Sequence, residues 1–341
     1  MGSVIGIDTH KDSVTGSVVD QVGRELDSVS AVNDGRGFRK VERFARRFGA
    51  TRIGIECSGS FGLALAQHLT AEGFDVREVP GQLVKRDRRS FSRGKSDAVD
   101  ALLIARVVAR EDKLPPPPFE GLEHDLKALV DHREDLLNEA TRHRNRAHGI
   151  LSQIRPGYSR VAPALTSSAQ LKAAERLVAQ NGSVRAQVLR DALGRVKELD
   201  DTAKELEKQI TALVKASGST LTAILGVGAI TAGRILGELR GVERLSGQAA
   251  FGALTGTAPV PASSGRTRRW RLNRGGNRQL NRAVHTIALT QSSHDPRARA
   301  YLEQKRAAGK TDKEAMRCLK RHLARVVYRR LVADQAKVLL T

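Results

Sequence analysis

Four consecutive prolines, at positions 115 to 118, divide this 341-residue chain into two sections that cannot share a helix or a central strand. Proline lacks a backbone N–H, clashes with the preceding helical turn and favours an extended, semi-rigid connector. We therefore expect a first domain at residues 1–113 and a linker at 114–119. After the linker we expect elements in which apolar residues recur with a different spacing.

The section before the prolines is predicted to alternate short strands and helices. β-Branched runs indicate strands, and apolar residues at helical spacing between capping residues indicate helices. Three strands followed by alternating helices and strands favour an α/β domain with a mixed sheet. The expected strands are residues 4–8, 14–19, 25–32, 52–56 and 74–79, and the expected helices are 38–48, 61–73 and the segment that starts at Asp97 behind Ser96 as N-cap.

The section after the prolines has a different period. Apolar residues alternate steps of three and four from Leu122 to Ile154 and again from Leu189 to Leu213, which is typical of a coiled coil. Arg133 and His143 fall inside the first seam, where a polar residue either sets register or partner choice or reaches the edge of the seam. Residues 120–216 are therefore expected to be coiled-coil helices, forming a helical hairpin or a dimerising arm.

Residues 217–341 are expected to form a mainly α-helical C-terminal domain. Near its start, LTAILGVGAITAGRILGEL (221–239) has two short helical patterns around a Gly-Val-Gly turn. This arrangement is similar to a helix-hairpin-helix, whose backbone amides can hold a phosphate. Glycine between two helices is more often only a turn, and that alternative stays open.

The charge balance indicates a polyanionic partner. Lys and Arg number 58 against 37 Asp and Glu, which gives a net charge of +21, and no acid occurs from Arg244 to His294. Nucleic acid is the first candidate, with arginines as phosphate clamps and Trp270 as a base-stacking ring; a solvated basic face is the alternative. The expected nucleic-acid contacts besides Trp270 are Lys85, Arg86, Arg88, Arg89, Arg93, Lys95, Arg266, Arg268, Arg269, Arg271, Arg274 and Arg278.

Cysteine usage and hydropathy bear on the compartment. Cys57 and Cys318 are far apart in the sequence and belong to no metal-ligand cluster, so neither a disulfide framework nor a zinc site is indicated. No apolar run is long enough to span a membrane, and an apolar strand that begins shortly after Met1 leaves no room for a signal peptide. We expect a soluble cytoplasmic protein without a membrane partner.

Four acids occur where expected strands end or an expected helix begins. Asp8 closes the first strand, Glu56 closes the fourth, and Asp97 and Asp100 open the last helix, where residues three apart are neighbours. In a ribonuclease-H-like sheet the first and fourth strands are adjacent and the final helix packs against them, so the four acids would converge. Neighbouring carboxylates repel unless a divalent cation lies between them, and hard oxygen ligands favour Mg²⁺, with Mn²⁺ as a second choice, for phosphoryl transfer.

The ordinary alternative for these acids is structural. Asp97 and Asp100 would then be first-turn residues favoured by the helix dipole, and Asp8 a turn residue. The occurrence of all four in these positions on a strongly basic chain favours metal-dependent phosphoryl transfer.

Several segments together carry a family likeness. GIDTHKDS (6–13), IGIECSG (53–59), KSDAVDA (95–101), ILGVGAITAGRIL (224–236), AFGALTGTAPVPASSG (250–265) and RGGN (274–277) occur in order along the chain. Over nearly its whole length the chain resembles the Piv-type invertase and IS one-ten family of DEDD transposases. The resemblance implies a RuvC-like (ribonuclease-H-like) DEDD domain, a coiled coil and a C-terminal transposase domain, with Asp8, Glu56, Asp97 and Asp100 as the metal-binding acids.

The resemblance also implies a catalytic serine and particular partners. The family's serine nucleophile lies in a Ser-Gly pair, which corresponds here to Ser264, with Ser263 as the competing assignment. Members related to the bridge-RNA recombinases choose target and donor DNA with a structured non-coding RNA and assemble as dimers and tetramers. By resemblance we therefore expect DNA, a guide RNA and further copies of this chain as partners.

The expected function is a DNA transposase or site-specific recombinase of an insertion sequence, which uses Mg²⁺-bound acids and a covalent phosphoserine intermediate. The alternatives are a protein-read DNA invertase, a RuvC-like Holliday-junction nuclease, and a non-catalytic RNA- or DNA-binding protein. The nuclease leaves the serine and the arginine-rich segment unexplained, and the presence of all four acids argues against a pure binding protein.

Overall fold

The computed structural model describes residues 2–56, 58–88, 96–117, 121–261, 270–271, 273 and 275–338. The chain forms two compact units. The first contains Met1–His124 together with Arg240–Ser246, and the second contains Asp125–Leu239 together with Gly247–Thr341.

The first unit is built on a five-stranded mixed sheet with strand order β3-β2-β1-β4-β5. β1 pairs antiparallel with β2 and parallel with β4, so the predicted adjacency of the first and fourth strands is confirmed. β2 pairs antiparallel with β3, and β4 pairs parallel with β5. The strands are β1 (Ser3–Thr9), β2 (Ser13–Val19), β3 (Glu25–Val32), β4 (Ala50–Ile55) and β5 (Val76–Glu78).

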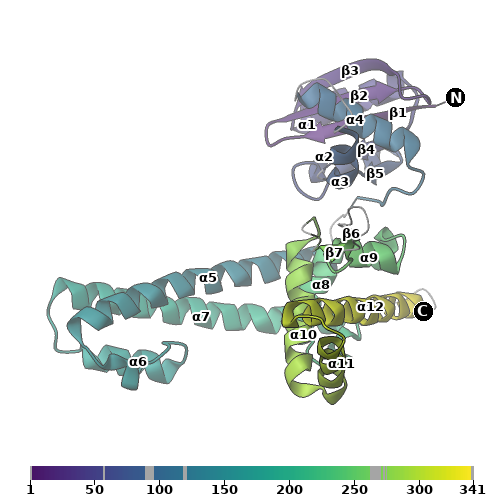
Figure 1. Cartoon of the computed structure of the whole chain (residues 1–341). Helices are drawn as coiled ribbons and strands as arrows, with labels where there is room; N and C mark the ends of the chain where they lie inside the picture. The colour runs from purple at the N-terminus through teal and green to yellow at the C-terminus, as the bar shows by residue number, and fades with distance from the viewer. Residues whose placement is uncertain are drawn as a thin grey trace. The chain divides into compact units, whose positions relative to one another are not determined.

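Helices cover both faces of this sheet (Figure 1). α1 (Gly35–Arg47) and α2 (Leu63–Ala71) bury an apolar layer against Ile5, Ile7 and their neighbours. α4 (Asp97–Arg110) packs on the opposite face, beside α3 (Gly81–Arg88). The sequence patterns predicted α1, α2 and α4 but not α3, because Pro80-Gly81 resembles a turn.

The second unit contains two long helices that pair within one chain. α5 (Leu122–Ile154) and α7 (Val184–Ala216) run antiparallel, connected through a 3₁₀ turn, η1 (Tyr158–Arg160), and α6 (Ser168–Leu177). Ion pairs across them follow that antiparallel order: Arg133 with Glu207 at 2.7 Å, Arg144 with Asp200 at 2.5 Å and Arg195 with Glu139 at 2.9 Å. Of the two expected arrangements, the chain adopts the helical hairpin.

The buried stripe of α5 differs from the predicted seam at alternate positions. Leu126, Ala140 and Ala147 are buried as predicted, but Val130 and Leu151 are buried where the pattern favoured Leu129 and Ile150. From Leu126 onward, the spacing between buried positions is therefore four and then three residues, whereas the predicted spacing was three and then four. Both series share every second position, so the apolar letters alone could not separate them.

Arg144 belongs to the observed stripe and not to the predicted seam. Its guanidinium donates to both carboxylate oxygens of Asp200 at 2.5 Å and to the carbonyl oxygen of Leu165 at 3.0 Å, with both ionic side chains largely buried. This planar, two-pronged contact joins α5, α7 and the connection between them. His143, which the predicted seam contained, lies beside it at the edge, 3.9 Å from Glu139.

Replacing Arg144 with methionine should lower the free energy of unfolding by about 2–3 kcal/mol, because Asp200 would remain largely buried without its cation. Urea unfolding followed by circular dichroism measures the change. The matched control is Lys208→Met, since the Lys208–Glu205 pair on α7 is exposed and its loss should cost at most about 0.5 kcal/mol. Equal effects of the two substitutions would show that the buried pair has no special role in the hairpin.

The remaining elements of the second unit are mainly helices. A 3₁₀ turn and a helix surround the Gly-Val-Gly segment, and the last helices pack against one another around α10 (Figure 1). The elements after α7 are η2 (Leu221–Ala223), α8 (Ala229–Leu239), α9 (Gln248–Leu254), β6 (Val260–Pro261), β7 (Trp270–Arg271), α10 (Arg278–His294), α11 (Pro296–Ala307) and α12 (Asp312–Val338); η3 (Val242–Arg244) lies in the first unit.

The helix-hairpin-helix expectation is wrong for its first helix, which is only the 3₁₀ turn η2. Asp334 of α12 accepts hydrogen bonds from both the backbone and the hydroxyl of Thr220, at 2.7 and 2.6 Å, and so anchors the chain just before the turn. Gly226 adopts a left-handed φ of +87° soon after it, which leaves too few residues for a helix. Gln291 of α10 also donates to the carbonyl oxygen of Leu225 at 2.8 Å, so this turn packs against protein.

Candidate metal centre and nucleic-acid interface

The alternation of side chains along β1 and β4 directs Asp8 and Glu56 to the same face of the sheet. Ile5, Ile7, Ile53 and Ile55 point into the layer under α1 and α2. Residues of the other parity point toward α4, since successive strand residues face opposite sides. Ile7 pairs with Ile55, so the acids that follow these isoleucines lie side by side.

The end of β1 and the residue after β4 are also tied through their backbones. The Glu56 N–H donates to the carbonyl oxygen of Ile7 at 3.2 Å, and the Thr9 hydroxyl donates to the carbonyl oxygen of Glu56 at 3.0 Å. These two bonds continue the pairing of the strands past Ile55. Asp8 and Glu56 are thereby fixed by the sheet rather than by a loop.

Two glycines let α4 approach the sheet closely enough to meet these acids. A Cβ added at Gly6 would lie 2.0 Å from the backbone nitrogen of Ala105 and 2.6 Å from the carbonyl oxygen of Ala101. A Cβ at Gly54 would lie 2.1 Å from a methyl group of Val108. Each glycine stands two residues before an acid, so the strand position that admits the helix is followed on the same face by a carboxylate.

The first turn of α4 supplies the other two acids. Ser96 is the N-cap, and its hydroxyl accepts a hydrogen bond from the Val99 N–H at 3.3 Å, which confirms the predicted start of the helix. Asp97 and Asp100 follow on one face, where the positive end of the helix dipole favours negative charge. The Asp97 side chain is 56% exposed, whereas that of Asp100 is only 13% exposed.

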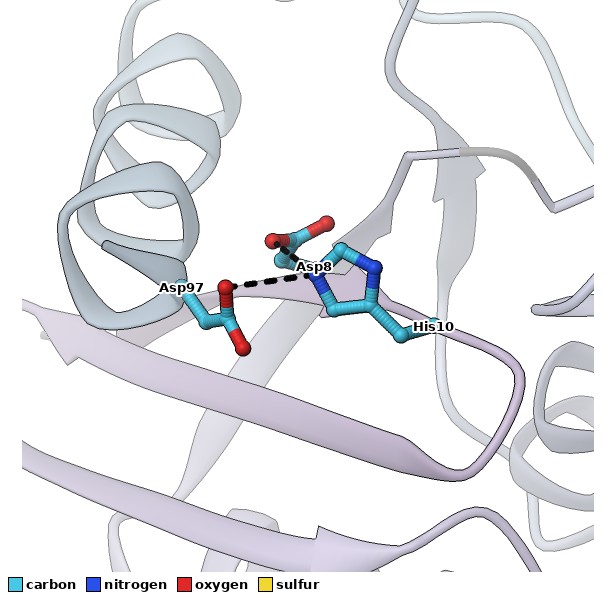
Figure 2. A group of neighbouring side chains, drawn as sticks. All are labelled: Asp8, His10 and Asp97. Carbon is cyan, nitrogen blue, oxygen red and sulfur yellow. Dashed lines mark ion pairs between the residues drawn. The ribbon is translucent and has the colours of Figure 1, made fainter. Parts of the chain in front are cut away.

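His10 joins the acids and was not predicted from the sequence. Its Nε2 lies 3.3 Å from Oδ2 of Asp8 and 3.3 Å from Oδ1 of Asp97, so the imidazole stands between the two carboxylates (Figure 2). Among the described residues, these three form the one group of His, Cys, Asp or Glu whose candidate ligand atoms all lie within 4.8 Å of one another. The sequence feature that could have indicated His10 is its position two residues after Asp8.

Arg88 of α3 approaches the cluster through Asp100. The two form an ion pair, and the Nη2 atom of Arg88 is buried without a hydrogen-bond partner in the part of the chain that the structure describes. Arg88 was predicted as a nucleic-acid contact, but here it pairs with one of the four acids. Lys85, on the same helix, acts electrostatically on Glu56.

The electrostatics of Asp8 and Glu56 show that the carboxylates converge. Burial raises the pKa of Asp8, and the charges of Asp100 and Asp97 raise it further, while His10 opposes the shift. Burial likewise raises the pKa of Glu56, with further contributions from Asp8 and Asp100 against the lowering effect of Lys85 and Arg88. Each of these two acids therefore resists ionisation, first because it is buried and second because other acids are close.

This donor set fits a hard divalent cation. Carboxylate oxygens are preferred by Mg²⁺ and Mn²⁺, and a divalent charge among them would relieve the repulsion that raises the pKa of Asp8 and Glu56. The imidazole of His10 adds a nitrogen ligand that Mn²⁺ accepts more readily than Mg²⁺ does. The cluster is a candidate metal centre on the α4 face of the sheet.

The predicted serine lies outside the described residues, and so does much of the predicted basic surface. The described part of the arginine-rich segment includes Trp270 and Arg271, both exposed on β7, and Arg278, exposed at the start of α10. The predicted residues outside the described part are Ser263, Ser264, Arg89, Arg93, Lys95, Arg266, Arg268, Arg269 and Arg274; for Arg86 the backbone alone is described. None of the helices in the described ranges is long and apolar enough to cross a membrane.

Two family models match most of this chain. Residues 5–156 match a model of DEDD transposases of the IS110 type, described as a transposase, and residues 218–303 match one described as the transposase IS116/IS110/IS902 family. All four acids of the cluster lie inside the first match. The second covers the segment that contains Ser264.

Curated proteins of insertion elements are similar to this chain over almost its whole length. An uncharacterized 43.6 kDa protein of IS110 from Streptomyces coelicolor is 26% identical, with 96% of this chain and 93% of the relative covered. An uncharacterized 44.8 kDa protein of IS116 from Streptomyces clavuligerus is 26% identical, with 95% and 93% covered. Among solved structures, Thermus thermophilus RuvC in complex with a Holliday junction substrate is similar over 34% of this chain and 99% of its own, with 19% identity and a TM-score of 0.28.

Proposed function

Because this chain belongs to the IS110 family of DEDD transposases, we propose that it cuts and rejoins DNA strands at the ends of an insertion sequence and at a target site, with a divalent metal ion held by Asp8, Glu56, Asp97 and Asp100. The observation that carries this proposal is the convergence of the four carboxylates on one face of the sheet. A DNA-binding protein without catalysis would have no need to bury mutually repelling acids.

Mg²⁺, or Mn²⁺ in its place, would polarise the scissile phosphate and stabilise the charge that develops on it. The residues of this chain would hold the metal ion and fix the orientation of its ligands. Asp8 and Glu56 are fixed by the sheet, and Asp97 and Asp100 by a capped helix, so all four ligands come from rigid elements. Arg88, whose Nη2 has no hydrogen-bond partner among the described residues, could contact a phosphate oxygen beside Asp100 through its guanidinium.

Ser264 is the proposed nucleophile. Its Oγ forms a bond to phosphorus as the bridging phosphorus–oxygen bond of the strand breaks, and the proton lost by the serine balances the proton gained by the departing sugar hydroxyl. The product is a phosphoserine ester that retains the energy of a phosphodiester for rejoining. The assignment of Ser264 is supported by family membership and by the arginine-rich stretch of sequence in which this serine lies.

A structured non-coding RNA is the proposed guide, and dimers and tetramers are the proposed assemblies. The net charge of +21 fits a protein that holds RNA and DNA together. Sequencing the nucleic acid that copurifies with protein expressed from its native locus tests the guide. A single discrete RNA from the flanking non-coding DNA supports it, whereas heterogeneous host RNA favours a protein-read transposase or invertase.

Replacing Ser264 with alanine should abolish the covalent protein–DNA adduct that the wild-type protein forms with cleavable DNA and Mg²⁺, because the hydroxyl that bonds to phosphorus would be gone. The adduct is measured by denaturing gel electrophoresis with labelled DNA. Ser263→Ala is the matched control and should retain the adduct. The reverse result would move the nucleophile to Ser263, and free cleaved ends without any adduct would indicate a junction nuclease that uses water.

A further inference from the structure

The second unit contains an open basin between α10 and α12, away from the acidic cluster in sequence. We name it the α10 basin and define it by Arg278, Asn281, Arg282, His285 and Lys320. Its volume is about 820 Å³, which is within the range of sites that take a nucleotide-sized ligand. Asn273, which also lines it, belongs to the segment that follows Ser264 closely in the sequence.

The charge of the α10 basin is one-sided. Arg278, Arg282, His285 and Lys320 line it, and the described part of the chain contributes no carboxylate to the lining. Arg282 is committed to an ion pair with Glu134 of α5. An adjoining hollow shares His285 and Lys320 and adds Lys313, Arg317 and one acid, Asp312, which is itself paired with Arg306 at 2.6 Å.

Lys320 brings a partly buried ammonium group into the α10 basin. Its Nζ donates to Oδ1 of Asn281 at 2.8 Å, a neutral acceptor, and the side chain is only partly exposed. Burial lowers the pKa of Lys320, and burial together with the charge of Lys320 lowers the pKa of His285. An ammonium group has three donors, and among the described residues Nζ meets the neutral oxygen of Asn281, so an anion in the basin would stabilise the charged form of Lys320.

The floor of the α10 basin is held in one shape. The Asn281 amide donates to the carbonyl oxygen of Thr255 at 2.7 Å while its oxygen accepts from Lys320, so both ends of the amide are fixed. Gly256 has a left-handed φ of +65°, and a Cβ at Gly276 would lie 2.5 Å from the Gly256 nitrogen. Two backbone segments are therefore in direct contact at the floor, and neither glycine has a side chain that would fill the basin.

We propose that the α10 basin binds a phosphodiester of the nucleic-acid backbone, with Lys320 and Arg278 as the charged contacts and Asn281 as the residue that orients Lys320. The inference rests on the proposed function only in taking nucleic acid as the ligand. A phosphate held here would fix the backbone of a bound strand against α10 and α12. The same chemistry serves DNA and RNA, so the experiment measures both.

The test is equilibrium binding of the full-length protein to labelled random-sequence single-stranded DNA and to RNA of the same length, in buffer with a chelator and over a series of potassium chloride concentrations. Lys320→Gln and Arg278→Gln should each weaken binding. Each should also reduce the slope of log affinity against log salt by about 0.7 to 0.9, because each removes one cation that pairs with a phosphate. The matched control is Lys310→Gln, which removes the same charge from an exposed turn of the same unit.

Each outcome decides the proposal. A reduced slope for DNA, for RNA or for both supports the α10 basin and identifies the source of its phosphate. Slopes equal to that of Lys310→Gln for both nucleic acids would overturn it. Arg278 is exposed in the first turn of α10, so its variant stays informative if Lys320→Gln impairs folding.

The proposed function and the proposed phosphate site in the α10 basin can be tested independently. If the wild-type protein binds nucleic acid through the α10 basin but never cuts DNA with Mg²⁺ or Mn²⁺, the proposed cleavage is wrong and the basin stands.

Discussion

Replacing Asp8 with asparagine should abolish metal-dependent DNA cleavage while leaving the protein folded. Asp8 is the most buried of the four acids, and its charge contributes to the raised pKa of Glu56 after burial. Loss of one such ligand removes several kcal/mol of charge stabilisation in the transition state, which corresponds to a rate reduction of about 10³-fold or more. Cleavage of labelled substrate DNA under single-turnover conditions measures the loss.

The same variant has a second readout that separates catalysis from folding. The pKa of Asp8 is raised in the folded protein, so its ionised form at neutral pH opposes folding when no metal is bound. In chelator, Asp8→Asn should therefore unfold at a slightly higher temperature than the wild type. Asp12→Asn, which removes an exposed acid from the turn between β1 and β2, should change neither activity nor stability appreciably. A loss of activity equal to that of Asp8→Asn in this control would count against the cluster.

Replacing Gly6 with alanine should destabilise the first unit by at least about 3 kcal/mol and should also remove divalent-metal binding. The added methyl group would overlap the backbone of α4 at Ala105 and Ala101, and a backbone cannot rotate away as a side chain can. The helix would have to move off the sheet and take Asp97 and Asp100 with it. Urea unfolding gives the stability change, and calorimetric titration with Mn²⁺ gives the loss of binding.

Gly35→Ala provides the comparison for this substitution. Gly35 begins α1 in the same unit, and the nearest atom to an added Cβ is the end of the Arg39 side chain at 3.9 Å. Its replacement should be neutral or stabilising by up to about 1 kcal/mol. Wild-type stability and Mn²⁺ affinity in Gly6→Ala would show that α4 does not depend on the glycine.

Much of the first unit could be predicted from sequence because its signals are local. β-Branched runs and capping residues gave the strands and α4, and the order of elements placed the first and fourth strands together. Once those strands are adjacent, the acids that follow them are neighbours by geometry alone. The convergence of Asp8, Glu56, Asp97 and Asp100 follows from that order, whereas their role in metal binding stays a prediction.

The features that sequence did not predict depend on contacts between distant segments. His10 has no periodic signal, and its position between Asp8 and Asp97 arises only when β1 and α4 are packed. The pairing of Arg88 with Asp100 depends on α3, whose first residues resembled a turn. In α5, both possible seams share Leu126, Ala140 and Ala147, and the observed stripe contains Arg144, whose partner Asp200 lies on another helix.

The α10 basin was missed for the same reason. Arg278 was predicted as a phosphate contact from local charge, but Lys320 and His285 belong to helices whose packing the pattern could not give. The prediction for Ser264 lies outside the described residues and is unaffected by these contacts.

The helical hairpin sets a distance within the second unit. At 1.5 Å per residue, α5 and α7, each of 33 residues, are about 50 Å long. Their apolar seam is filled from within one chain, and the ion pair of Arg144 with Asp200 holds the two helices against sliding. A contact made at the α6 end is therefore kept about 50 Å from the helices around α10. That length equals roughly 15 base steps of duplex at 3.4 Å each.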